Sequence, residues 1–519
     1  MLATASARPS GDRLARLGPA TFAALTLGIH VACWGRYGLF RDELYFLVCG
    51  QRLAWGYVDQ PPGIALVARL AQAMFGIWVP GLRLFPWLAS AGTVYLTGRL
   101  AGRLGGGGAA GTLGAAGAFA CIYLLALGHT LTMNAFEPLL ILGLAVVLLR
   151  LAEGADPRLW LAAGALAGAA VLFKYTATSL CALFLVGLLA SPARKVIWTR
   201  WALAGAGVAA LLVLPNLAWQ AAHGFPFMEL ARNGVSRKNA PITPLGFALE
   251  VIKDTNPGAA VLWTCGIAWL LVAPAARPAR FIGLAGLAYL LLLMFGKGKG
   301  YYLTPAIPML IAAGAAAAGR ILRRPGWVHA YTGLVTVSAL VLAPLAIPLL
   351  SESSFVRYQS ALGQKPGGSE RKTYGALPQY FADMHGWPEL AAAVARVYQR
   401  LSPAEQRTAL VYGDNYGLAS AVNVLGPALG LPEGLGISGH NHYWVWGLPP
   451  GRGDPMLVIG RPGQDCGGIY ERAELGEQLG YDPWVMPYED GHAITICRGL
   501  RRPARLPMSR LPERLRHFE

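Results

Sequence analysis

The sequence has few charged residues, and acidic ones are the scarcest. Charged residues make up 14% of the 519 residues, against roughly 25% in an average soluble protein. Only 27 residues are acidic and 44 are basic, so the formal net charge is +17. Hydrophobic residues reach 55%, above the roughly 45 to 50% of soluble proteins. This composition argues against an ordinary soluble protein.

Several familiar chemical patterns are also missing. The sequence contains no Ser-His-Asp arrangement, no Cys-rich zinc spacing and no repeat of fixed period, so it gives no support to a triad hydrolase or a structural zinc protein. Five of the seven cysteines lie in or beside apolar runs, where Cys usually acts as a small buried hydrophobe. The other two are Cys466 and Cys497. Sequence does not fix their separation, so a disulfide and two free thiols remain alternatives.

The sequence is rich in long apolar runs. Crossing a bilayer requires on the order of 20 apolar residues, and about eleven runs of this kind occur. They lie near 20–37, 84–101, 109–127, 133–151, 159–173, 176–190, 201–219, 258–274, 280–295, 301–319 and 328–349. A cleavable signal peptide is the alternative for the first run, because arginines precede it. The ten later runs favour a polytopic α-helical membrane protein of about eleven spans.

The basic residues predict the orientation of these spans. Alternate loops collect most of them, which places the N-terminus inside: Arg99, Arg103, Arg150, Arg158, Arg194, Lys195, Arg200, Arg277, Arg280, Arg320, Arg323 and Arg324. An odd number of spans then puts residues after 350 outside a plasma (inner) membrane. The opposite loops still carry basic residues, which need another explanation: Arg41, Arg52, Lys174, Arg232, Arg237, Lys238, Lys253, Lys297 and Lys299. Nothing here predicts a nucleic acid partner.

The chain divides at about residue 350. Residues 1–19 are predicted to form a cytoplasmic tail, and 20–350 a transmembrane domain with outer loops at about 38–83 and 222–257. After residue 351 the apolar runs stop, and short strand-like segments alternate with a helix-like one. These are "TALVYG" (408–413), "PMLVIG" (455–460), "HAITICRG" (492–499) and "WPELAAAVARVYQRL" (387–401). Such alternation predicts an extracytoplasmic α/β domain over 351–519, large enough to bury its own core.

Two adjacent carboxylates follow the first span. Ionised groups beside a bilayer are costly unless they pair, reach water or serve a site, so Asp42 and Glu43 are candidate functional residues, with Glu43 predicted to bind substrate. Adjacent helical residues point about 100° apart, so only one of them is expected to face a given cavity. The alternative is that both pair with Arg41 and solvate a helix end.

The segments around these acids resemble a known family of membrane enzymes. They are "WGYVDQPPGIALVARL" (55–70), "LTMNAFEPLLIL" (131–142), "LFKYTA" (172–177) and "GKGKGYYLTPAIPML" (296–310). Together they are similar to GT-C fold glycosyltransferases that use polyprenyl-phosphate sugars, the family 39 group with protein O-mannosyltransferases and lipid A aminoarabinose transferases. The tail segments "YGDNYGLASAVNVLG" (412–426) and "SGHNHYWVWG" (438–447) resemble those of bacterial members.

The resemblance assigns roles to two carboxylates. Asp42 matches the first acidic position, where a general base accepts the proton of an acceptor hydroxyl as its oxygen attacks the anomeric carbon. Glu137 matches the second acidic position, although Asp is more usual there. Glu137 also precedes Pro138, and this pair is an ordinary helix start, so catalysis and helix initiation both remain open for it.

The resemblance also offers a reason for several outer cations. Charge grows on the polyprenyl phosphate as the glycosidic bond breaks, and Lys174, Lys297 and Lys299 would stabilise it. Tyr301 and Tyr302 would hydrogen-bond the phosphate or line the sugar site. The alternatives are snorkelling from a helix end for the lysines and ordinary interfacial tyrosines.

Three weaker candidates complete the set. Asp59 lies before a Pro-Pro turn and either contacts the sugar or only forms the turn. The segment 63–78 that follows is amphipathic enough to lie on the membrane surface. His440 and His442 have the spacing of two metal ligands on a strand, but no third ligand is evident. A bound divalent metal remains an open alternative on the strength of these two histidines, and the sequence predicts no cofactor.

The sequence thus predicts an inverting membrane glycosyltransferase that moves a sugar from a polyprenyl-phosphate carrier to a lipid, polysaccharide or protein acceptor. One alternative is a transporter or flippase of lipid-linked sugars, against which no charge lies clearly at mid-span and no paired broken helices are evident. The other is a binding protein with the same fold. The sugar and the acceptor are not encoded in these motifs.

Overall fold

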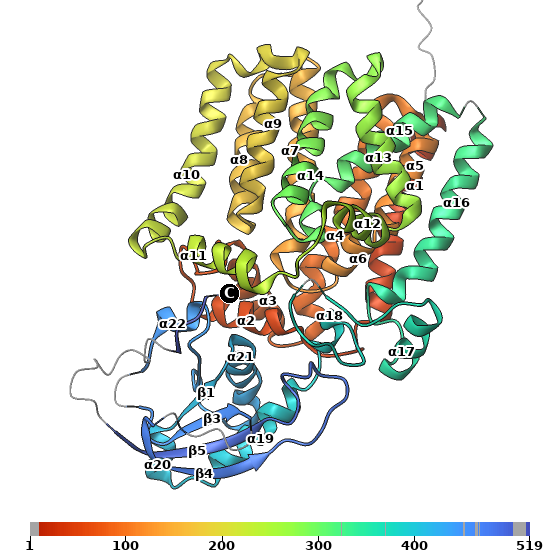
Figure 1. The fold of residues 1–519 in the computed structure, drawn as a ribbon. Helices are drawn as coiled ribbons and strands as arrows, with labels where there is room; N and C mark the ends of the chain where they lie inside the picture. Colours follow the sequence, from red (N-terminus) through yellow and green to blue (C-terminus); the bar gives the residue numbers. More distant parts are fainter. Residues whose placement is uncertain are drawn as a thin grey trace, which may run out of the picture.

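The structure, a computed structural model, describes residues 10–322, 324–368, 370–449, 452–461, 466, 468–501 and 515–518. Long helices stand side by side and form the larger part of the molecule (Figure 1). A small sheet with its own helices lies against one end of this helical part (Figure 1). The two parts meet around two short helices, α2 (Arg41–Gln51) and α21 (Tyr416–Leu425).

A helix occupies each predicted apolar run, so the mostly helical fold is confirmed. These helices are α1 (Ser10–Ala32), α4 (Val79–Ala101), α5 (Gly107–Ala120), α7 (Glu137–Ala152), α8 (Leu159–Phe173), α9 (Thr176–Leu189), α10 (Arg200–Ala222), α13 (Pro257–Val272), α14 (Arg280–Phe295), α15 (Ile307–Ile321) and α16 (Pro325–Leu342). By length and composition, four described helical segments suffice to cross a membrane, or five if a bent pair counts as one span. The number of spans therefore stays a prediction.

Some boundaries differ from the predicted ones. The first helix begins at Ser10, within the predicted tail, and the run at 109–127 breaks at Cys121, whose backbone is extended between α5 and α6 (Ile122–Leu127). The run at 301–319 opens with a 3₁₀ turn, and α15 begins after it. Helix α15 carries a proline in its first turn. Proline suits a helix start because the first N–H groups have no partner there. Helix starts thus follow local breakers that hydropathy alone does not show.

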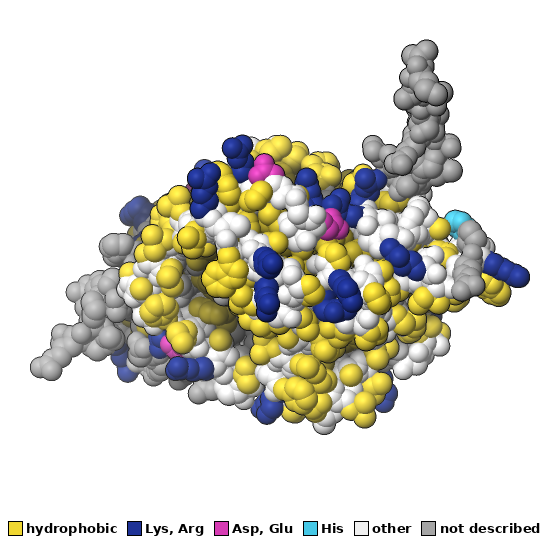
Figure 2. Space-filling view, turned by 90° about the horizontal axis from the view of Figure 1, so that it is seen from above, with side chains coloured by type: hydrophobic (Ala, Val, Ile, Leu, Met, Phe, Trp, Pro, Cys, Tyr) yellow, Lys and Arg dark blue, Asp and Glu magenta, His cyan; other side chains and the backbone are white. Residues whose placement is uncertain are grey.

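The end of the helical part remote from the sheet is rich in basic side chains. Viewed onto that end, Lys and Arg side chains outnumber the acidic ones (Figure 2). Contacts between loops explain part of the pattern, since Arg103 pairs with Glu153 at 2.5 Å and Arg320 donates to the carbonyl of Leu104 at 3.3 Å. The turns after α4, α7 and α15 therefore meet at this end. Three of the loops predicted to be inner therefore share one end of the molecule, and their side of the membrane stays a prediction.

The C-terminal part contains a five-stranded sheet in the order β2-β1-β3-β5-β4. Strand β1 (Leu410–Gly413) runs parallel to β2 (Gly436–Ile437) and β3 (Met456–Gly460), and β5 (Ala493–Leu500) is antiparallel to β3 and β4 (Tyr470–Gln478). The strands and the helix predicted from four segments are present, the helix being α19 (Trp387–Gln399). Cys497 on β5 forms a disulfide with Cys466, and their Cα atoms are 5.9 Å apart.

The sheet and helix α2 share one hydrophobic core, which differs from the independent core expected for the C-terminal part. Leu44 and Leu47 of α2 belong to the same buried cluster as Leu418 and Val422 of α21, together with residues of β1 and β3. Helix α21 is buried on nearly all sides, and such a helix needs apolar cover on every face. The sheet covers one side and α2 covers another.

Candidate active site

Asp42 lies at the contact between the two parts of the molecule. It sits in the first turn of α2, where the helix N-terminus favours a negative charge. Its Oδ1 accepts a 2.7 Å hydrogen bond from the hydroxyl of Tyr416, the first residue of α21. The Asp42 side chain is still 33% exposed. A carboxylate that is oriented and yet reachable from solvent suits proton transfer.

Glu43 points in another direction and is completely buried. Arg83 of α4 donates to both of its carboxylate oxygens, through Nε at 2.9 Å and a terminal nitrogen at 2.7 Å. The backbone N–H groups of Phe40 and Leu131 complete the set, each at 2.7 Å. Asp42 and Glu43 thus face different surroundings, as adjacent helical positions should. These contacts favour a supporting role for Glu43, whose substrate-binding role stays a prediction.

Arg41 fastens the start of α2 to the C-terminal part. Its guanidinium donates to the hydroxyl of Tyr488 at 2.7 Å and lies 3.4 Å from the carboxylate of Asp383. Its backbone N–H donates to the carbonyl of Asp383 at 2.9 Å. Burial raises the pKa of Asp383 to about 6, although Arg41 pulls it down. Arg41 therefore serves the contact between the two parts more than it serves Asp42, whose Oδ1 is 3.8 Å away.

A second group of predicted residues gathers around Lys174, in the break between α8 and α9. Its ammonium donates to the side-chain oxygen of Asn134 at 2.7 Å and lies 3.6 Å from Glu137. Glu137, the first residue of α7, is 1% exposed and also accepts from Thr176 at 2.7 Å. We call Asn134, Glu137, Lys174 and Thr176 the Lys174 cluster. The predicted tight helical pair places this cation at a helix break, where Asn134 and Glu137 are its polar partners.

Tyr301 and Tyr302 lie against the ammonium of Lys174. The Lys174 ammonium lies over the ring of Tyr302 at 4.4 Å and over that of Tyr301 at 5.4 Å. The structure therefore brings together four residues that the resemblance singled out: Glu137, Lys174, Tyr301 and Tyr302.

The two lysines between α14 and α15 behave differently from each other. Lys299 lies 3.0 Å from Glu370, and Lys372 lies 3.5 Å from the other oxygen of the same carboxylate. Lys297 is exposed and has a left-handed backbone with φ of 55°, a conformation that costs energy for a residue with a side chain. Lys299 is thus held near Tyr301, whereas Lys297 faces solvent. Both assignments as phosphate ligands stay predictions.

Asp59 and the two histidines lie near the contact between the two parts of the molecule. Asp59 accepts a 2.7 Å hydrogen bond from the hydroxyl of Tyr45. The imidazole of His442 accepts from the backbone N–H of Val58 at 3.2 Å, and burial lowers the pKa of His442 to about 3. The ring of His440 instead packs on Tyr416 at 4.7 Å. No group of three potential metal ligands occurs among the described residues, and a metal at His440 and His442 stays a prediction.

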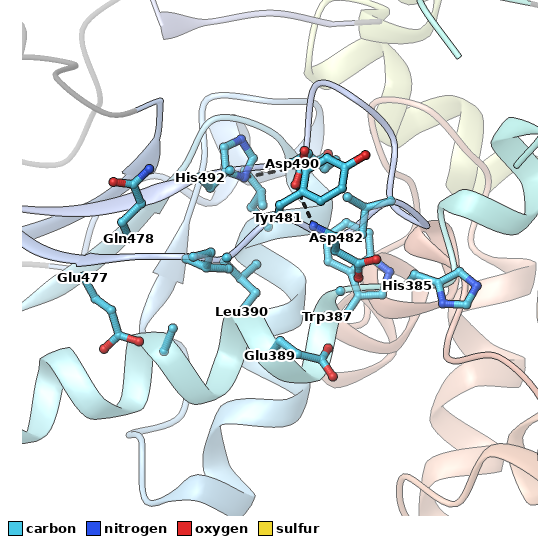
Figure 3. A pocket seen from close by; sticks show the side chains of 18 of the residues that line it. His385, Trp387, Glu389, Leu390, Glu477, Gln478, Tyr481, Asp482, Asp490 and His492 are labelled. Carbon is cyan, nitrogen blue, oxygen red and sulfur yellow. Dashed lines mark hydrogen bonds and ion pairs between the residues drawn. The ribbon is translucent and has the colours of Figure 1, made fainter. Parts of the chain in front are cut away.

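Two clefts of about 520 Å³ each lie in the C-terminal part. The first opens beside Asp42, and Arg41, Lys372, Tyr416, His440 and Tyr488 are among its lining residues. The second lies between α19 and the chain that follows β4, and Figure 3 shows Glu389, Glu477, Asp482 and Asp490 around it. Of the candidate residues, His440 lines the first cleft and none lines the second. The first cleft is also lined by Arg41 and Tyr416, which both contact Asp42, so a molecule in it would lie near this carboxylate.

Sequence reasoning missed several residues of this region. Arg83 carried a usable signal, since a charged residue at the edge of an apolar run is unusual. Asn134 and Thr176 lay inside quoted motifs, but nothing distinguished them from their neighbours. Tyr416 and Asp383 gave no local signal, because their importance depends on contacts with α2, more than 300 positions earlier in the chain.

Comparison with known sequences gives one family match. The model of the family described as dolichyl-phosphate-mannose-protein mannosyltransferase matches residues 59–219. This stretch contains Asp59, Glu137 and Lys174 but begins after Asp42. No curated protein matches the chain by sequence.

Solved structures match over most of the chain. ArnT from Cupriavidus metallidurans in the apo state gives a TM-score of 0.58 at 16% identity, covering 92% of this chain and 97% of ArnT. ArnT bound to undecaprenyl phosphate gives 0.57 with the same identity and coverage. The oligosaccharyltransferase AglB from Archaeoglobus fulgidus, in complex with an inhibitory peptide and a dolichol-phosphate, gives 0.52 at 11% identity, covering 80% of this chain and 64% of AglB. The resemblance to GT-C fold glycosyltransferases is thereby confirmed.

Proposed function

We propose that this chain is an inverting membrane glycosyltransferase that takes a sugar from a polyprenyl-phosphate carrier at the outer face of the membrane. The family match and the shared fold support a glycosyltransferase with a lipid-linked donor. The acceptor supplies a hydroxyl group and is a lipid, a polysaccharide or a protein. The observation that carries the proposal is the state of Asp42, a held carboxylate that remains 33% exposed beside a cleft.

The reaction needs one base and one stabilised leaving group. The acceptor oxygen attacks the anomeric carbon and passes its proton to Asp42. The bond from that carbon to the phosphate oxygen breaks, and the polyprenyl phosphate leaves with the electron pair. Attack opposite to the leaving group inverts the anomeric centre. A preorganised cation beside the phosphate lowers the barrier because its charge grows as the bond breaks.

Lys174 is the cation best placed for this purpose. It is 13% exposed and is oriented by Asn134 and Glu137, so no reorganisation is needed when a phosphate arrives. The next residue, Tyr175, lines an apolar groove of about 460 Å³ between α8, α9 and α10. A lipid chain in that groove would end near Lys174. Glu137 then orients the cation, while Lys299, Tyr301 and Tyr302 border the phosphate or the sugar.

The outer-face placement has two supports. Basic side chains gather at the end remote from the sheet (Figure 2), and Cys466 pairs with Cys497 in the C-terminal part. Disulfides persist mainly in oxidising compartments outside the cytoplasm. A reporter active only in the cytoplasm should work when fused after Arg103 or Arg200 and fail after Ser354. A working fusion after Ser354 would overturn the placement.

The function is tested by following both halves of the donor. Purified protein in detergent is mixed with a panel of polyprenyl-phosphate monosaccharides, carrying radiolabelled sugars, and with a membrane extract as acceptor. We expect free polyprenyl phosphate and labelled acceptor to appear together, and Asp42→Asn to slow both by about 10² to 10⁴. Asp156→Asn is the matched control, because Asp156 is exposed in the turn between α7 and α8.

The same assay separates the alternative functions. A flippase would move the donor across a vesicle membrane without releasing polyprenyl phosphate, and a binding protein would retain it unchanged. If no donor of the panel is cleaved although the protein binds one of them, the enzymatic proposal is wrong.

A further inference from the structure

The hydrogen bond between Tyr416 and Asp42 crosses from the C-terminal part to the helical part. The two residues are 374 positions apart in the chain, yet the phenol oxygen and Oδ1 are 2.7 Å apart. Tyr416 is 7% exposed. The ion contact of Arg41 also falls on Oδ1, and within the described part of the chain Oδ2 has no hydrogen-bond partner. Tyr416 thus occupies one oxygen, and the other is left to accept a proton.

Tyr416 is held rigidly at the start of α21. The side chain of Asn415 caps this helix by accepting from the N–H groups of Gly417 and Leu418 at 2.8 and 3.2 Å, an arrangement that fixes a helix start. The phenol ring packs against Tyr45 with ring centres 4.9 Å apart. These contacts set the direction of the hydroxyl independently of Asp42.

The next residue explains how α21 comes so close to α2. A Cβ atom on Gly417 would lie 2.6 Å from Cγ of Arg41, which is closer than real carbon atoms approach. Glycine therefore lets the start of α21 pack directly on the residue beside Asp42. The backbone bond from Arg41 to Asp383 and that from Gly38 to Met384, at 3.1 Å, hold the same contact from the other side.

Tyr416 remains a proton donor throughout the working range of pH. Burial raises its pKa well above the usual value, and the charge of Asp42 adds to this effect while Arg41 opposes it. A neutral phenol cannot compete with the acceptor for a proton, but it can fix the rotation of the carboxylate. Orientation of this kind affects the rate of the chemical step rather than the affinity for substrate.

We infer that the C-terminal domain completes the proposed active site by supplying Tyr416 as the positioning residue for Asp42. This inference rests on the proposed role of Asp42 as the general base. It means that the domain acts on the chemical step through the carboxylate of Asp42. The sheet and α21 then form one functional unit with the first outer loop, in agreement with their shared core.

The test is a double-mutant cycle on single-turnover transfer, with donor and acceptor saturating. Tyr416→Phe removes only the hydroxyl, and we expect a loss of about ten- to hundredfold, as for a hydrogen bond to a charged group. The Michaelis constant for the acceptor should change little. In the Asp42→Asn background the same substitution should have no further effect, because its action passes through that carboxylate.

The matched control is Tyr443→Phe. Tyr443 is 2% exposed, and its hydroxyl bonds to Ser420 and Asn423 of the same helix α21. Its removal costs a buried hydrogen bond without touching Asp42, so the rate per folded molecule should stay at the wild-type level. Should Tyr416→Phe fail to fold, Gly417→Ala takes its place, because the added methyl group pushes α21 away from Arg41.

The outcomes separate the two hypotheses. Normal transfer by Asp42→Asn would overturn the general base and with it the role of Tyr416. Slow transfer by Asp42→Asn with normal transfer by Tyr416→Phe would overturn only the role of Tyr416. An equal slowing by Tyr416→Phe in both backgrounds would also overturn it, because the hydroxyl would then act elsewhere.

Discussion

Asp42 and Glu137 both lie in the first turn of a helix, but their surroundings differ in kind. Asp42 is 33% exposed and is held by a hydroxyl from a distant segment. Glu137 is 1% exposed and is held by Lys174 and Thr176, which lie 37 and 39 positions later. A carboxylate that must exchange a proton needs access, whereas one that orients a cation needs burial. Equivalent helix positions thus acquire different uses.

The largest expected effect separates the two carboxylates directly. Asp42→Asn should reduce the single-turnover rate by about 10² to 10⁴ and leave carrier affinity almost unchanged. Glu137→Gln should instead weaken carrier binding, because Lys174 loses an oriented partner. Binding is measured with polyprenyl phosphate and rate with the labelled donor. An equal loss of rate in both variants would contradict this division of roles and show that Glu137 acts in the chemical step.

The second prediction concerns the neighbour of Asp42. Arg83→Met leaves the buried carboxylate of Glu43 without its cation, so the free energy of unfolding should fall by about 3 to 5 kcal/mol. The double variant Glu43→Leu with Arg83→Met removes both charges and should recover most of that loss. Chemical unfolding in detergent measures both. If Glu43 binds substrate instead, the double variant will be stable but will lose substrate affinity.

The third prediction concerns how the stability of the protein depends on pH through Asp383, which contacts Arg41 at the start of α2. The folded-state pKa of Asp383 is about 6, above the ordinary 3.8, so between these values the folded state keeps a proton that the unfolded chain has lost. Its stabilising contribution is complete below about pH 4 and disappears as the pH rises through 6. Relative to Asp383→Asn, the wild type should therefore lose up to about 3 kcal/mol of unfolding free energy between pH 4 and 6. Parallel curves for the two proteins would contradict this assignment.

The smallest effect concerns the Lys174 cluster. Lys174→Gln removes a charge-assisted contact with the carrier phosphate, so the dissociation constant for polyprenyl phosphate should rise about tenfold, equivalent to about 1.4 kcal/mol. Lys253→Gln is the control, because Lys253 is 57% exposed and pairs with Asp254. Unchanged binding by Lys174→Gln would move the phosphate site toward Lys299.

Local patterns predicted the helical architecture well. Each apolar run formed a helix, and the tight pair broke at Lys174 because one charged residue interrupts an otherwise continuous run. The strands of the C-terminal part also followed short apolar segments between turns. Boundaries such as the start at Ser10 and the break at Cys121 were missed, since hydropathy changes gradually there.

The site was predicted only in part. The resemblance pointed to Glu137, Lys174, Tyr301 and Tyr302, which the fold brings together. Glu43 was predicted to bind substrate, and this role stays a prediction beside its contacts with Arg83 and two backbone N–H groups. Two adjacent acids look alike in a sequence, and only the packing of α4 against the start of α2 distinguishes the buried one.

Local sequence patterns were enough to predict the helices and most strands of this protein, because these elements depend on side chains a few positions apart. They also determined which scarce charges had to be paired or functional, because burying an ion is costly. The residues that contact these charges follow from tertiary packing. Tyr416 meets Asp42 because α21, buried on nearly all sides, needs α2 as cover, and Gly417 permits the approach. A contact between residues 374 positions apart depends on how formed helices and strands pack together, and no local sequence pattern encodes it.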